Sequence, residues 1–211
     1  MKLIGMLDSP YVRRVAISLQ LLGLRFEHQA LSVFRTFDEF HRINPVVKAP
    51  TLVCDDGEVL MDSTLILQYA EALASPRTLM PSESKALQHE LRLIGLALAA
   101  TEKSVQIVYE RGLRPPEKLH EPWVSRVTGQ LLDAFGELEY ELGAVTPGQT
   151  SSSLRQGGLS IGVAWHFVQQ MTPDVVPKEG FPRISAYSAV LETLPEFMAA
   201  PHGDGTYKSA A

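Results

Sequence analysis

The residues best placed for chemistry are Ser9 and Asp62-Ser63, each at the start of a predicted helix. Residues 2–7 form a short apolar run that predicts a buried strand, and the apolar residues after Pro10 recur at the spacing of one helix face. Ser9 therefore occupies an N-cap position, and Pro10 fits the first helical position. Because a helix start presents unpaired backbone N–H groups, it stabilises an anion such as a thiolate. The alternative is that Ser9 only caps its helix.

Two more features of the same region suggest a binding site for a peptide-like ligand. At the helix that follows Asp62 and Ser63, the N-terminus would hold a ligand carboxylate, and Asp62 would hold an ammonium group. Pro50 opens a predicted strand, and a cis bond after Ala49 would turn the Ala49 backbone outward to pair with an extended peptide. The alternatives are two capping residues and an ordinary trans proline.

Composition excludes several classes of protein. The chain has 211 residues, 45% hydrophobic and 20% charged, which is typical of a soluble globular protein. A net charge of -5 argues against nucleic-acid and anionic-membrane partners. The single cysteine, Cys54, excludes an internal disulfide framework and fits a reducing compartment. The N-terminus has no signal-peptide layout and no run is apolar enough to span a bilayer, so we expect a cytoplasmic protein without a metal site.

The order of elements predicts an α/β domain followed by an all-α domain. Residues 1–75 read as βαβαββα, with an Asp56-Gly57 turn between two strands, which gives a mixed sheet with helices packed on it. Prolines and polar residues predict a linker over residues 76–84. Strand signals are absent from residues 85–211, where long helical periodicities predict a bundle, a last short helix from Pro195 and a loose tail from Pro201.

Three stretches carry a resemblance to a known family. They are residues 9–15 (Ser-Pro-Tyr-Val-Arg-Arg-Val), 44–52 (Asn-Pro-Val-Val-Lys-Ala-Pro-Thr-Leu) and 62–66 (Asp-Ser-Thr-Leu-Ile). With them the chain resembles the glutathione transferases over nearly its whole length. The resemblance implies a thioredoxin-like N-terminal domain, an all-helical C-terminal domain, glutathione as co-substrate and a homodimer.

The resemblance also implies a role for each matching residue. Ser9 would hydrogen-bond the glutathione sulfur, and Ala49, before a cis-Pro50, would pair with the cysteinyl backbone. Asp62 and Ser63 would bind the γ-glutamyl end, and Lys48 would meet the glycyl carboxylate. The chain departs from the family at Ala49, where Val or Ile is usual, at Asp62, where Glu is usual, and at Val163, where the helix start after Ser160 usually has Asp.

The second substrate is expected between the domains, over Ser9. Its candidate walls are Leu7, Tyr109, Arg111 and Trp165, although aromatic residues are also typical of cores and Arg111 of a solvated helix face. The function expected is conjugation of the glutathione thiolate to a small hydrophobic electrophile, as in detoxification, or reduction of peroxides. The alternatives are a non-catalytic glutathione-binding or protein-docking member of the fold, and a glutathione-dependent isomerase or lyase.

Overall fold

The computed structural model describes residues 1–207, which form two compact units. Unit 1 contains Met1–Leu79 together with the described residues from Thr193 onward, and unit 2 contains Met80–Glu192. The C-terminal segment, which the sequence placed in the helical domain, therefore groups with the N-terminal elements.

Unit 1 is built on a four-stranded mixed sheet with strand order β2-β1-β3-β4. β1 runs parallel to β2 and antiparallel to β3, and β4 is antiparallel to β3. This confirms the predicted βαβαββα order. The elements are β1 (Lys2–Ile4), α1 (Pro10–Leu21), β2 (Glu27–Gln29), α2 (Phe37–Ile43), β3 (Thr51–Val53), β4 (Val59–Met61), α3 (Ser63–Ala74) and, from the C-terminal segment, α8 (Pro195–Ala199).

The hairpin between β3 and β4 turns where the Asp-Gly pair predicts. Gly57 has a φ of 89°, a value that favours glycine, and its N–H donates to the Cys54 carbonyl at 3.1 Å. Cys54 itself is buried, and burial raises the pKa of its thiol. This agrees with a core role rather than a reactive one.

The C-terminal segment is attached to unit 1 by several contacts, so the loose tail expected from Pro201 is wrong for residues 201–207, and its last four residues lie outside the described part of the chain. Arg13 of α1 donates from Nε to the Ala200 carbonyl at 2.8 Å, and its guanidinium lies over the Phe197 ring. The Tyr207 ring stacks on Phe26 with centroids 4.5 Å apart. Short-range patterns could not show these contacts because they join residues that are nearly the length of the chain apart.

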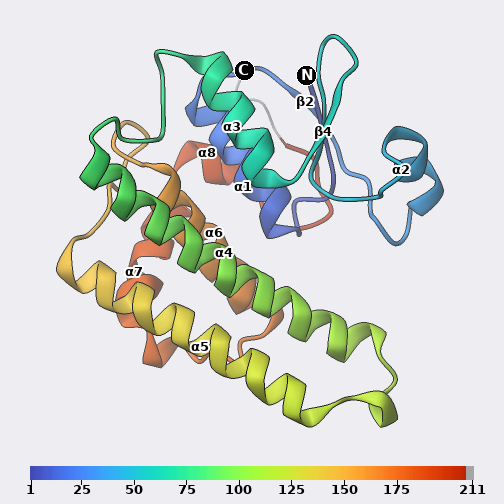
Figure 1. The fold of residues 1–211 in the computed structure, drawn as a ribbon, viewed down its shortest axis with the longest axis vertical. Coiled ribbons are helices and arrows are strands. Elements are labelled where there is room, and N and C mark those ends of the chain that lie inside the picture. The colour runs from blue at the N-terminus through green and yellow to red at the C-terminus, as the bar shows by residue number, and fades with distance from the viewer. Residues whose placement is uncertain (208–211) are drawn as a thin grey trace. The chain divides into compact units, whose positions relative to one another are not determined.

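Unit 2 is helical throughout its described elements, as predicted. α4 and α5 lie side by side along most of their length (Figure 1). Within residues 1–207, no helix has the length and apolar character needed to cross a membrane. The elements are α4 (Ser84–Leu113), a short 3-10 helix (Pro116–Lys118), α5 (Glu121–Ala144), α6 (Gln156–Met171), a second 3-10 helix (Lys178–Gly180) and α7 (Pro182–Leu191).

Helix α6 begins four residues earlier than the sequence suggests, because a distant side chain caps it. Ser160, the expected first residue, is buried inside the helix and donates its hydroxyl to the Gln156 carbonyl at 2.7 Å. The Gly157 N–H donates instead to the carboxylate of Glu90, which is 7% exposed and belongs to α4. A Cβ on Gly157 would lie 2.7 Å from that carboxylate oxygen, so glycine is required for the contact.

Replacing the Glu90 carboxylate tests this long-range cap. Glu90→Ala leaves the buried Gly157 N–H without its acceptor, so the free energy of unfolding of the full chain should fall by about 1–3 kcal/mol. Glu90→Gln keeps an acceptor oxygen and should lose less. Denaturant unfolding measures both, and an unchanged stability for Glu90→Ala would contradict the cap.

The docking of the tail should depend on pH through His28. Its Nε2 bonds the Gly5 carbonyl at 2.7 Å and its Nδ1 accepts the Tyr207 N–H at 2.9 Å, so the ring is held in the neutral form with the proton on Nε2. Burial lowers the His28 pKa from its ordinary value of 6.5. The contribution of the neutral ring is therefore full above about pH 6.5 and is lost as the pH falls below that value towards the folded-state pKa.

An NMR titration of the Tyr207 amide checks this dependence. The amide signal should move towards its unstructured position as the pH falls below about 6.5. In His28→Gln, which does not titrate, the same signal should stay independent of pH. A Tyr207 signal that follows the same pH course in both proteins would rule out His28 as the cause.

Candidate functional site

The Ser9 hydroxyl lies at the N-terminus of α1, as predicted. Ser9 is the N-cap, with φ −72° and ψ 122°, and its Oγ accepts the Val12 N–H at a long 3.5 Å. Since the oxygen acts as acceptor in this bond, the hydroxyl proton remains for donation to a ligand. The position thus combines a donor with the positive end of a helix.

The loop that leads to Ser9 packs against Ala49 because Gly5 has no side chain. Gly5 has a φ of 135°, and a Cβ there would lie 2.6 Å from the Val12 side chain and 3.1 Å from the Ala49 Cβ. The Ala49–Pro50 peptide bond is cis, as predicted. Ala49 therefore lies beside the start of α1.

Asn44, the first residue of the 44–52 stretch and one to which the sequence assigned no binding role, organises the loop that carries Lys48 and Ala49. Its buried amide donates to the Thr51 Oγ1 at 2.8 Å, and its Oδ1 accepts the Val46 N–H at 3.0 Å. Thr51 in turn donates its hydroxyl to the Lys48 carbonyl at 2.7 Å. The loop is thus held from inside by polar side chains.

At the start of α3, Asp62 and Ser63 have different surroundings. Asp62 caps the helix by accepting the Thr64 N–H at 2.9 Å, while its other oxygen lies 3.8 Å from the Lys48 Nζ. Ser63 is 4% exposed, and its Oγ accepts a hydrogen bond from Arg14 at 3.1 Å. Lys48 and Asp62 were expected at opposite ends of a ligand, whereas the structure pairs them with each other. Because both side chains are about half exposed, this ion pair is weak, and Lys48 can leave it to contact a ligand.

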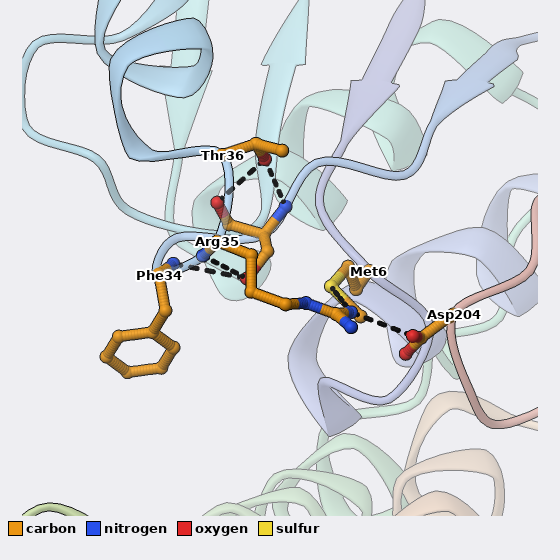
Figure 2. A network of polar contacts seen from close by, with 6 residues as sticks. Met6, Phe34, Arg35, Thr36 and Asp204 are labelled. Atoms are coloured by element: carbon orange, nitrogen blue, oxygen red, sulfur yellow. Dashed lines mark hydrogen bonds and ion pairs between the residues drawn. The ribbon is translucent and has the colours of Figure 1, made fainter.

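The C-terminal segment reaches the same end of unit 1. Figure 2 shows the Arg35 guanidinium between Asp204 and Met6, which precedes the Ser9 turn. Arg35 donates to Asp204 at 2.8 Å and contacts the Met6 sulfur at 3.4 Å. The pKa of Asp8, the residue before Ser9, is raised mainly by burial and secondly by the negative charge of the nearby Asp204. Residue 204 therefore lies near the loop that leads to α1.

The residues expected to form the wall for a second substrate fall into two groups. Leu7 is fully buried in the core of unit 1, and Trp165 is 4% exposed and packs edge-on against Phe135 in the core of unit 2. We therefore correct both assignments, because neither side chain presents a face to a ligand. Tyr109 is 44% exposed and lines an open pocket within unit 2, while Arg111 pairs with Asp174 at 2.8 Å.

Within unit 1, the predicted binding residues come together. The close approach at Gly5 brings Ala49 next to the start of α1. An ion pair links Lys48 to Asp62, and a hydrogen bond links Arg14 of α1 to Ser63. Among residues 1–207, no three or more His, Cys, Asp or Glu side chains are grouped to hold a metal ion. The arrangement offers a donor at a helix start, a second helix start and charges of both signs.

Comparisons with known proteins show what the sequence and the fold are similar to. Residues 3–78 match the family described as "Glutathione S-transferase, N-terminal domain". The chain is 24% identical over 216 residues to Glutathione S-transferase U3 of Arabidopsis thaliana, an alignment that covers 92% of this chain and 84% of the relative.

Solved structures extend the similarity to both units. A glutathione transferase family member from Pseudomonas fluorescens Pf-5 with bound glutathione has a TM-score of 0.80 at 28% identity, over 94% of this chain and 97% of that one. Its structure with bound S-(propanoic acid)-glutathione has a TM-score of 0.78, also at 28% identity, over 94% and 95%. A Methylobacterium radiotolerans glutathione S-transferase in complex with glutathione sulfonate shares the fold, with a TM-score of 0.85 at 23% identity over 100% and 95%. The sequence match to the glutathione S-transferase N-terminal domain family thus covers residues 3–78, and the similarity to glutathione transferases extends over most of the rest of the chain.

Proposed function

We propose that this protein binds glutathione in unit 1 and joins its thiolate to a small hydrophobic electrophile. The observation that carries the proposal is the Ser9 hydroxyl, which lies at the α1 N-terminus and uses its oxygen, not its proton, in the cap. A glutathione sulfur placed there would accept the hydroxyl proton in a hydrogen bond. The residues around Ser9 would then bind the rest of the peptide.

Each of these residues offers a group that matches one part of glutathione. The Asp62 carboxylate would hold the γ-glutamyl ammonium, and the α3 N-terminus with the Ser63 hydroxyl would hold the adjacent carboxylate. The backbone of Ala49, before the cis Pro50, would pair with the cysteinyl residue. Lys48 would leave Asp62 to meet the glycyl carboxylate, which exchanges one ion pair for another.

The reaction follows from stabilisation of the thiolate. A free thiol has a pKa of about 8.5, so little thiolate exists at neutral pH without help. Donation from Ser9 and the α1 N-terminus would lower that pKa, so that the thiol loses its proton to solvent. The thiolate sulfur would then form a bond to the electrophilic carbon as the bond from that carbon to its leaving group breaks, and the leaving group would depart with the electron pair. The Pseudomonas fluorescens protein holds S-(propanoic acid)-glutathione, which supports a conjugation reaction, although the same thiolate would also reduce a peroxide.

Two alternatives remain beside this proposal. A non-catalytic binding or docking protein would bind glutathione without ionising its thiol, or would not bind it at all. An isomerase or lyase would form the thiolate but would transform a different second substrate. The homodimer and the cytoplasmic location stay predictions, and the oligomeric state is open to measurement by sedimentation.

The substitution Ser9→Ala tests the role of the hydroxyl. A hydrogen bond to a charged group is worth about 1.5–3 kcal/mol, so the pKa of bound glutathione should rise by about one to two units. Turnover at neutral pH should fall by roughly 10- to 100-fold, while the affinity for S-methylglutathione should stay nearly unchanged. Ultraviolet absorbance of the thiolate follows the pKa, and calorimetry follows the affinity.

Ser9→Thr is the matched control because it keeps both the hydroxyl and the capping oxygen. It should retain most of the thiolate stabilisation and of the turnover. If Ser9→Ala leaves the thiol pKa and the turnover at wild-type values, Ser9 has no part in the mechanism.

A further inference from the structure

Arg14 is a buried cation next to the start of α3. Its side chain is 3% exposed, and its NH1 donates to the Ser63 Oγ at 3.1 Å and to the Thr64 Oγ1 at 3.3 Å. A buried charge is costly and persists only where its surroundings compensate it. Burial lowers the pKa of Arg14 to about 10, and the negative charge of the nearby Asp62 offsets part of this decrease. Arg14 therefore stays protonated at neutral pH.

The position of this charge adds to the positive end of a helix. The α3 N-terminus already presents unpaired N–H groups and a positive dipole end, and Arg14 lies against its first two residues. Asp62 supplies one negative charge at this point, but it is about half exposed and faces Lys48 as well. The remaining positive potential favours an anion at the α3 N-terminus.

The hydrogen bond from Arg14 also sets the direction of the Ser63 hydroxyl. Because Arg14 has no acceptor, the Ser63 oxygen must be the acceptor in this contact. One lone pair of Ser63 is thereby occupied from the buried side, and its O–H is left to donate elsewhere. A carboxylate at the α3 N-terminus is an acceptor in the right place.

We propose that Arg14 is a positioning residue for glutathione: through its hydrogen bond it orients the Ser63 hydroxyl towards the γ-glutamyl carboxylate, and its buried charge adds to the positive potential at the α3 N-terminus. The inference rests on the proposed function, since it needs glutathione bound with that carboxylate at α3. It adds a residue that does not itself touch the ligand.

The neighbouring Arg13 provides a matched control. It has the same side chain on the same helix and is 2% exposed, but it points to the C-terminal segment, where it bonds the Ala200 carbonyl and lies over Phe197. Removing either charge from α1 disturbs a buried contact. Only the removal of Arg14 should change how a ligand carboxylate is held.

The test compares two ligands in wild type, Arg14→Gln, Arg14→Lys and Arg13→Gln by calorimetry. The ligands are glutathione and 4-aminobutyryl-cysteinyl-glycine, which lacks the γ-glutamyl carboxylate but keeps the amine. Wild type should bind glutathione about 10- to 150-fold more tightly than the analogue. Arg14→Gln should reduce that ratio by about tenfold, whereas Arg14→Lys, which keeps the charge, and Arg13→Gln should retain most of it.

If Arg14 has only a structural role, Arg14→Gln will weaken the binding of both ligands equally and leave the ratio of their affinities unchanged. That result overturns the proposal. The proposal is also overturned if Arg13→Gln and Arg14→Gln reduce the ratio alike. Should Arg14→Gln fail to fold, Arg14→Lys takes its place: a ratio kept near the wild-type value supports the charge at this position, and a ratio that falls to one overturns it. Equal affinity of wild type for the two ligands also overturns the proposal, because it leaves no carboxylate contact for Arg14 to position. Wild type that binds neither ligand overturns the proposed function together with this inference, whereas binding without the carboxylate preference overturns the inference alone.

Discussion

The burial of α1 is the constraint on which unit 1 depends. Ten of its twelve residues are buried, so the helix is fixed on nearly every side by the sheet, by α3 and by the C-terminal segment. A helix held in this way has a fixed N-terminus, and Ser9 is the residue at that point. A donor that must meet a sulfur atom within hydrogen-bond distance needs such a rigid support.

The buried polar residues of α1 connect this helix to other elements by hydrogen bonds. Arg13 and Arg14 are adjacent in the sequence and equally buried, yet one bonds the C-terminal segment and the other bonds the first turn of α3. Ser18 satisfies its own hydroxyl by donating to the Arg14 carbonyl. Because an unpartnered buried polar group is costly, each of these contacts also fixes the element at its other end.

Local patterns predicted most of the fold. The periodicity of apolar residues, the Asp56-Gly57 turn and the proline at 195 gave the order of elements, because each signal acts within a few residues. The α6 start was misplaced since its cap, Glu90, comes from another helix. The attachment of the tail was missed for the same reason: its partners Arg13, Phe26 and His28 lie far away in the sequence.

In the candidate site, too, the features set by neighbouring residues could be predicted and those set by distant residues could not. Ser9 and the Asp62-Ser63 pair could be read from the sequence because capping is local, whereas the role of Asn44 depends on Thr51 and that of Arg14 on Ser63. An arginine on a helix carries no local sign of its direction, so Arg13 and Arg14 look equivalent until the fold separates them. Leu7 was misjudged because an apolar residue just before the Ser9 turn can be a core residue as easily as the wall of a binding site.

Thiolate formation by bound glutathione is the central claim, and one calorimetric titration tests it most directly. Glutathione is titrated into the purified protein at neutral pH in two buffers of different ionisation enthalpy, with S-methylglutathione as the ligand that has no proton to lose. The account predicts that glutathione binds and releases close to one proton per site, while S-methylglutathione binds without release. Binding of both ligands without proton release would contradict the role given to Ser9, and no binding at millimolar glutathione would contradict the site as a whole.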